Sequence, residues 1–197
     1  MKKTKINFIT FILLIMSLNF AQSQTKKNSI QTSEENANCT RKRNLSFKNR
    51  IKNFPFNLTS QIIFVSHKTK EGSVGEELQK YLNSLKIGQD TINEKEFLEI
   101  KKIKLNQIEK LTDIIFNYGF KSKYHSIKDT KCYDPRNAIL FLDKDKKVIA
   151  FIEICFGCDN LRTSDVKIDF GEYCEQKFDL IKKIFADSGI KFGITEN

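Results

Sequence analysis

The stretch from Asn137 to Cys158 constrains the fold more than any other part of the chain, because its pattern is typical of a β-hairpin. Two apolar runs, 138–142 and 148–156, are separated by five polar residues. A connection of this length suits a hairpin. Both faces of the second run are mostly apolar, and Glu153 interrupts one of them. Such a strand normally lies in the middle of a sheet that helices cover.

The rest of the chain from residue 54 onward predicts two further strands and three helices. Strands are expected at 61–65 and 97–105, and helices at 73–85, 106–118 and 169–188. Asn106 with Glu109 resembles a capping box, Gly189 is a suitable helix stop, and the polar residues 159–168 are expected to form a loop. The order β-α-β-α-β-β-α predicts a two-layer α+β fold, with helices packed on a mainly antiparallel or mixed sheet.

Residues 1–23 have the three parts of a secretory signal peptide. Three lysines precede an apolar run at 6–20, and Ala21-Gln22-Ser23 follows as a small-x-small cleavage site. The apolar run is short and polar residues interrupt it, which disfavours a membrane anchor. We therefore expect cleavage near Ser23, export to the periplasm or the extracellular space, and no transmembrane segment in the mature chain.

Charge divides the remainder of the chain at about residue 53. The whole chain has 34 basic and 24 acidic residues, for a net charge of +10. Residues 24–53 are polar and strongly basic, so we expect a disordered basic arm. Residues 54–197 are nearly neutral and have the size of one α+β domain. Because the basic excess lies outside this domain, the composition does not indicate a nucleic-acid partner.

Four of the five cysteines lie in or beside the hairpin, namely Cys132, Cys155, Cys158 and Cys174. In an exported protein, thiols within reach of each other normally form disulfides. Four cysteines permit three pairings, among which the sequence does not choose. We expect Cys155 to pair with Cys158 across the turn and Cys132 to pair with Cys174. An odd number of cysteines leaves one over, and Cys39 in the predicted arm is the expected outlier.

The Cys155-x-x-Cys158 spacing also allows a redox-active dithiol or a metal site. A catalytic pair normally begins a helix, whose N-terminus stabilises the thiolate, and no helical pattern follows Cys158. A zinc cage of four thiolates would normally show a second Cys-x-x-Cys, which this chain lacks. We therefore expect no metal and no cofactor.

A nucleophilic cysteine paired with a histidine is another interpretation, with His67 or His125 as the base. Glu153 either acts beside the thiol or simply reaches solvent or a hydrogen-bond partner, and the second interpretation is favoured. The chain has no phosphate-binding glycine loop and no hydrolase or metalloprotease motif. The sequence therefore favours a protein that is not an enzyme without excluding one.

Cys132 to Phe141 (CYDPRNAILF) and Ile152 to Cys158 (IEICFGC) carry a resemblance. The chain resembles a group of uncharacterised exported bacterial proteins of Bacteroidetes-like composition, over Cys132 to about Gly193. These proteins pair a Pro-Arg-(His/Asn)-(Ala/Gly) strand with an apolar strand that ends in Cys-Phe-x-Cys. The resemblance implies export and supplies no activity.

These patterns lead to one hypothesis and one alternative. The first is an exported, disulfide-stabilised, non-enzymatic domain that binds a protein or a small ligand. The alternative is a thiol-dependent redox protein or enzyme that uses Cys155 and Cys158.

Overall fold

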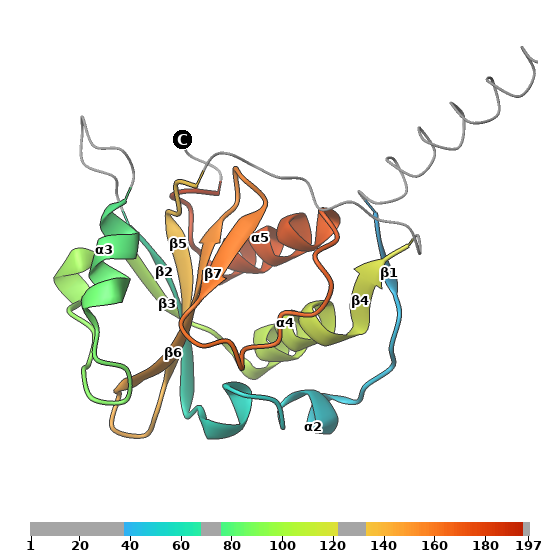
Figure 1. Cartoon of the computed structure of the whole chain (residues 1–197), viewed down its shortest axis with the longest axis horizontal. Helices are drawn as coiled ribbons and strands as arrows, with labels where there is room; N and C mark the ends of the chain where they lie inside the picture. Colours follow the sequence, from blue (N-terminus) through green and yellow to red (C-terminus); the bar gives the residue numbers. More distant parts are fainter. Residues whose placement is uncertain (1–37, 68–75, 122–132, 195–197) are drawn as a thin grey trace, which may run out of the picture.

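A five-stranded antiparallel sheet forms the centre of the protein (Figure 1). The computed structural model describes residues 38–67, 76–121 and 133–194. The strand order is β3-β2-β5-β6-β7. The strands are β2 (Gln61–Ser66), β3 (Glu99–Lys102), β5 (Asn137–Leu142), β6 (Val148–Cys155) and β7 (Asn160–Thr163). The expected α+β class, with helices on a mainly antiparallel sheet, is confirmed.

The predicted hairpin is the pair β5 and β6 at the centre of this sheet. Leu142 lies opposite Val148 and Phe141 lies opposite Ala150, so Ile149 has no partner of its own and forms a bulge. Because of the bulge, Val148 lies on the opposite face of the sheet from the face that strict alternation would give it. Val148 therefore packs in a different core cluster from Ala150, whereas strict alternation would place both on one face of the strand.

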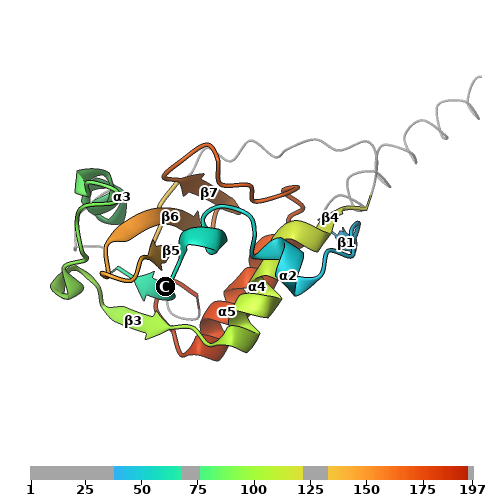
Figure 2. The same ribbon diagram turned by 90° about the horizontal axis from the view of Figure 1, so that it is seen from below.

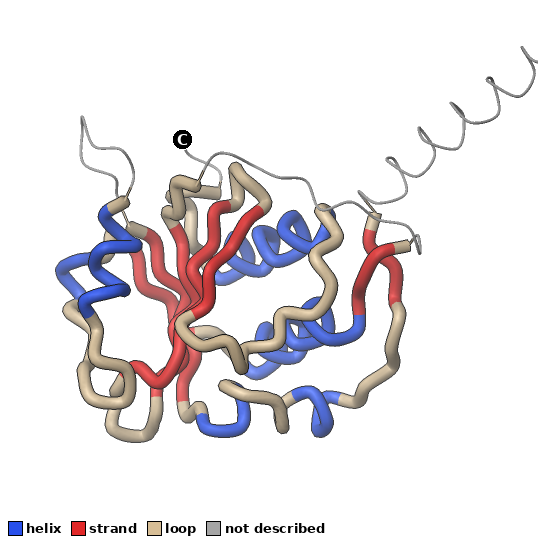
Figure 3. The backbone as a smooth tube through the Cα atoms, in the orientation of Figure 1, coloured by secondary structure: helices blue, strands red, loops and turns tan. Residues whose placement is uncertain are grey.

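Helices cover both faces of the sheet, which explains why the central strands are apolar on both sides (Figure 3). α4 (Leu105–Asn117) and α5 (Gln176–Ser188) lie on one face, where the rings of Phe64 and Phe185 stack with centroids 3.8 Å apart. α3 (Glu77–Ser84) lies on the other face, as the view from below shows (Figure 2), and buries Leu78 and Leu82. Two short 3-10 turns, η1 (Phe56–Leu58) and η2 (Glu94–Glu96), connect these elements.

Three local predictions need correction. α4 begins one residue before the expected Asn106, because the Gln107 carboxamide oxygen accepts a hydrogen bond from the backbone N–H of Lys104 at 2.8 Å. α5 begins at Gln176 and is shorter than expected, and it ends at Gly189, which has a φ of 91° as a helix stop requires. The expected loop at 159–168 contains strand β7, which pairs with the end of β6.

Residues 38–53, which the composition assigned to a disordered arm, are part of the fold. β1 (Cys39–Arg41) pairs with β4 (Tyr118–Phe120), and the short helix α2 (Phe47–Arg50) packs on α4. Arg50 is buried and its guanidinium donates to the carbonyls of Leu45 and Glu109 and to Thr112 Oγ1. Backbone pairing and a buried arginine hold this segment in place. Its low apolar content therefore did not indicate disorder, as the composition had predicted.

The predicted signal peptide, residues 1–23, lies outside the described residues. Within the described ranges no helix has the length and apolar character needed to cross a membrane.

Candidate functional site

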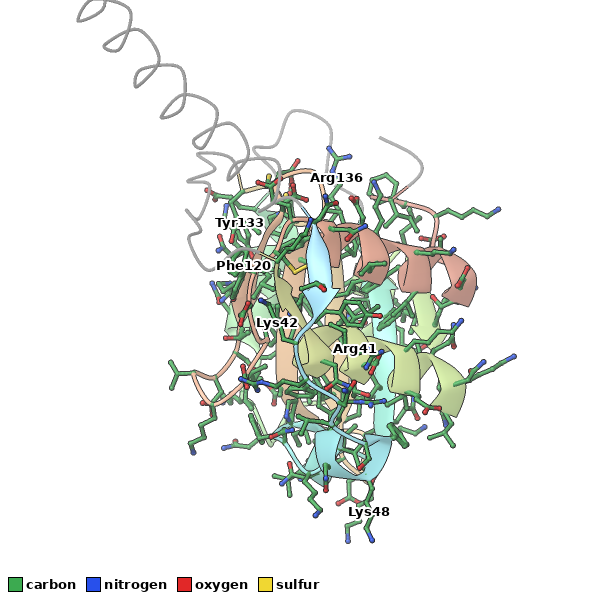
Figure 4. The ribbon with its side chains drawn as sticks, turned by 90° about the vertical axis from the view of Figure 1, so that its right-hand side faces the viewer. Arg41, Lys42, Lys48, Phe120, Tyr133 and Arg136 are labelled. Carbon is green, nitrogen blue, oxygen red and sulfur yellow. A yellow bond between two sulfur atoms is a disulfide. The ribbon has the colours of Figure 1, made fainter. Side chains whose placement is uncertain are left out.

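A cavity of about 200 Å³ opens where β5 begins and β6 ends. Because the two strands are antiparallel neighbours, the first residue of β5 and the last of β6 reach the same edge of the sheet. Figure 4 shows Arg136 and Tyr133, from the segment before β5, at the end of the molecule opposite Lys48. The cavity is lined by Asp134, Arg136, Asn137, Cys155, Phe156, Gly157, Cys158 and Gly193.

The C-terminal segment is fixed against one wall of this cavity. The Asn137 side chain is 1% exposed and its amide nitrogen donates to the Phe192 carbonyl at 3.0 Å. Gly193 has a φ of 77°, and a Cβ added there would lie 2.4 Å from Asn137 Oδ1, so only glycine fits. Arg136 lies 5.8 Å over the ring of Phe192 and pairs with Asp134 at 3.3 Å. The wall is therefore built from charged and amide groups held by several contacts.

Cys155 is a buried free thiol on the cavity wall. Burial raises the pKa of this thiol, although backbone N–H groups of Asp134, Cys158 and Gly157 donate to the sulfur and act in the opposite direction. The thiol is therefore mostly protonated at neutral pH. The expected Cys155–Cys158 disulfide is wrong in this structure, because Cys155 is free.

The disulfides follow a different pairing from the one expected. Cys39 is bonded to Cys174 with Cα atoms 5.4 Å apart, so the predicted Cys132–Cys174 bond and the role of Cys39 as the outlier are both wrong. β1 carries Cys39 to the start of α5, where its backbone N–H also donates to Gln176 Oε1 at 3.1 Å. Cys158 is also disulfide-bonded.

Glu153 is fully buried and hydrogen-bonded, as the favoured interpretation predicted. Its Oε2 accepts from the Tyr133 hydroxyl at 2.9 Å and from Arg162 Nε at 2.7 Å. Burial, together with the adjacent Glu153 carboxylate, raises the pKa of Tyr133. Arg162 also donates to Asn83 Oδ1 at 2.6 Å, which ties β7 to α3.

Sequence reasoning missed Arg162 as a member of this cluster. A carboxylate within an apolar strand requires a cation or donors nearby, and Arg162 follows Glu153 by nine residues in the chain. A β7 strand would have placed it directly opposite, in the observed register. Since Glu153 and Cys155 are two residues apart on one strand, this cluster borders the thiol.

Of the two histidines, only His67 lies in the part of the chain that the structure describes. His67 is buried at the end of β2, its backbone N–H donates to the Arg136 carbonyl at 2.8 Å, and its ring meets Phe97 edge-on. His67 is not among the described residues that line the cavity. His125 lies outside the described residues.

A second hollow lies away from the first cavity. The hollow, of about 170 Å³, is mainly apolar and lies between α2, η1 and the start of α4, where Phe47, Ile51 and Leu105 line it. In the described ranges, no cluster of three His, Cys, Asp or Glu side chains is arranged to hold a metal ion.

Comparison with known proteins adds no family. No family model matches the chain, and neither the curated proteins nor the solved structures contain a match. The geometry alone defines the class: an α+β protein with a disulfide-bonded N-terminal segment and a polar cavity at the end of its central strands. The resemblance to exported bacterial proteins stays a prediction.

Proposed function

We propose that this protein is an exported, disulfide-stabilised binding domain that holds a small polar ligand in the cavity at the end of β5 and β6. The cavity is the observation that carries the proposal. Asn137 and Cys155 lie at the ends of two central strands, and the other lining residues belong to the segments that adjoin these strands and to Gly193. Strand positions of this kind keep their geometry better than positions on loops alone. Ligand sites are normally concave, largely formed in advance and equipped with a few placed polar groups.

The lining favours a polar ligand over an apolar one. Asp134 supplies a carboxylate, Arg136 a guanidinium and Asn137 an amide, within one cavity. Both signs of charge are present, so the lining suits a ligand with its own donors and acceptors. The Cys39–Cys174 disulfide supports an oxidising compartment, since disulfides persist mainly outside the cytosol.

A ligand screen with an occluding variant tests this proposal. A Cβ at Gly157 would meet no atom within 4 Å, so Gly157→Leu adds a side chain at the cavity without a steric clash at its base. Gln89→Leu is the matched control, because Gln89 is exposed in the turn at the other end of the sheet, where Gly88 N–H bonds to the Val148 carbonyl.

The measurement is a screen of small polar metabolites by NMR chemical shift with the oxidised protein. We expect ligands that move signals of cavity residues to bind the Gln89→Leu protein normally and the Gly157→Leu protein at least about tenfold more weakly, about 1.4 kcal/mol. Equal affinity for both variants, or the absence of any ligand at the cavity, would contradict the proposal.

A thiol-dependent redox protein is the second candidate, and one observation favours it. A free thiol at Cys155 and a disulfide-bonded Cys158 line the same cavity, three residues apart. Equilibration with glutathione buffers measures the reduction potential of the Cys158 disulfide. A potential above about −230 mV would match the thiol oxidoreductases, whereas one below about −300 mV is typical of a structural bond and would refute this candidate.

A further inference from the structure

The apolar hollow between α2, η1 and the start of α4 is held in shape by contacts within its walls. Arg50 of α2 donates to Thr112 Oγ1 and to the Glu109 carbonyl, each at 3.2 Å, and so fixes α2 on α4. The Thr59 hydroxyl donates to the Pro55 carbonyl at 2.7 Å, which closes η1. The hollow, of about 170 Å³, is therefore formed in advance of any partner.

Apolar side chains reach solvent at this hollow. Leu105, at the start of α4, lines it and is 68% exposed, and Leu58 of η1 is 60% exposed. Phe47 and Ile51, which α2 and its C-terminal end contribute to the lining, are half-buried. A single exposed leucine is ordinary, whereas apolar side chains gathered at a hollow and bordered by polar residues are typical of an interaction surface.

Positive charge lies beside these apolar side chains. Residues 47–62 and 104–110 include every described residue that lines the hollow, and they contain five basic residues and one acidic residue. Arg50 is buried, and the other five charged residues are exposed, namely Lys48, Lys52, Lys104, Lys110 and Glu109. Figure 4 shows Lys48 extending from α2 at the end of the molecule. The surface is therefore complementary to a partner that carries negative charge next to apolar material.

We propose that the apolar hollow and its lysines dock the protein on an anionic lipid bilayer. Such a bilayer presents negative headgroups directly over hydrocarbon, and it attracts clustered lysines. Leu58 and Leu105 enter the boundary between headgroups and acyl chains, as the apolar face of an interfacial helix does. The lysine stems lie along the apolar surface and keep their ammonium groups among the headgroups.

The kind of cation favours a lipid partner over a protein partner. Protein interfaces are enriched in aromatic residues and arginine and depleted in lysine. At the apolar hollow the exposed cations are all lysines, and the most exposed apolar side chains are leucines. The docking does not depend on the cavity at the end of β5 and β6, because the two sites share no described lining residue.

Sedimentation with lipid vesicles tests the proposal. The oxidised mature protein is mixed with vesicles of phosphatidylcholine alone, or of equal parts phosphatidylcholine and phosphatidylglycerol. We expect binding to the anionic vesicles to be at least about tenfold stronger than binding to the neutral ones. It should weaken at least about tenfold between about 0.05 M and 0.5 M NaCl, because salt screens the lysines. Equal binding to both kinds of vesicle, or no binding to the anionic kind, would overturn the proposal.

One pair of variants tests the apolar part of the surface. Leu105→Asn removes an exposed apolar side chain, so it should weaken binding to the anionic vesicles at least about fivefold. Leu98→Asn is the matched control, because Leu98 is 53% exposed and its backbone N–H donates to the Ser66 carbonyl at the far end of β2. The control should bind as the wild type does, and both variants should keep its melting temperature. Equal binding by the two variants would contradict insertion at the hollow.

A second pair of variants tests the charged part. The double variant Lys48→Gln with Lys52→Gln should bind the anionic vesicles at least about tenfold more weakly than the wild type. The control is Lys95→Gln with Lys183→Gln, which removes the same charge from exposed positions on η2 and α5, outside the lining of the hollow. If the two double variants weaken binding equally, the net charge of the protein and not this surface is responsible, and the proposal is refuted.

Discussion

Lys177 offers the sharpest physical test of the fold, because its amine is completely buried on α5. Its Nζ donates to the carbonyls of Ile115 and Phe170, each at 3.1 Å. Burial lowers its pKa from 10.5 to about 8, although the carboxylates of Glu172 and Asp169 act in the opposite direction. A neutral amine has two hydrogens, so it can donate a hydrogen bond to each of the two carbonyls without carrying a charge.

This pKa makes stability depend on pH in a defined direction. Between about pH 8 and pH 10.5 the unfolded chain keeps the Lys177 proton and the folded chain loses it. The free energy of unfolding therefore rises with pH across this window. A pKa of about 8 in place of 10.5 corresponds to a total change in the free energy of unfolding of about 3 kcal/mol.

Urea denaturation of the wild type and of Lys177→Met at several pH values measures this effect. Raised pKa values of Tyr81, Tyr133, Tyr173 and Cys155 destabilise the folded state at alkaline pH, but these groups are present in both proteins and cancel in the difference. We expect the stability of the wild type relative to Lys177→Met to increase by about 2 kcal/mol from pH 7.5 to pH 10. A difference that stays constant or falls with pH would refute the reasoning.

Four further predictions follow from the contacts described above. Cys39→Ser opens a loop of 135 residues and should lower the free energy of unfolding by about 2–5 kcal/mol in urea denaturation, whereas an effect below 1 kcal/mol would contradict a structural bond. Gly171→Ala should destabilise by at least about 2 kcal/mol, because the residue has a φ of 68° and a Cβ would lie 2.4 Å from the Ile115 carbonyl, while Gly157→Ala should change stability by less than about 1 kcal/mol. Arg162→Met leaves the buried Glu153 carboxylate with only Tyr133 and should cost about 2–4 kcal/mol, while Lys144→Met on the exposed hairpin loop should cost almost nothing. N-terminal sequencing of the protein recovered from outside the cytoplasm should begin near Gln24, and a chain that keeps Met1 would contradict the predicted signal peptide.

Elements with strong local periodicity could be predicted from the sequence. The β5–β6 hairpin is two apolar runs around a polar turn, and the faces of α3 and α4 repeat at helical spacing. Gly189 could be recognised as a helix end, because glycine readily adopts the left-handed backbone conformation that a helix stop requires. Each of these signals lies within a dozen residues or so of the element that it predicts, so no long-range contact is needed to recognise it.

The elements that could not be predicted depend on contacts between distant residues. β1 has three residues and no apolar pattern, and it exists because it pairs with β4 and carries a disulfide to α5. β7 is short and polar. Its position is fixed by strand pairing with the end of β6 and by the hydrogen bond that Arg162 donates to Glu153. Of the candidate site, the sequence predicted only the two cysteines. The cavity could not be predicted, because it also requires Gly193 from the distant C-terminal segment.

The bond between Cys39 and Cys174 has a consequence for a chain delivered N-terminus first into an oxidising compartment. Cys39 emerges before every other cysteine, and its partner emerges last, 135 residues later. During that interval Cys39 meets Cys132, Cys155 and Cys158, each of which can trap it in a non-native bond. Correct maturation therefore depends on delayed oxidation or on an isomerase that reopens early bonds, and production in a host without such an enzyme should yield mixed disulfide forms.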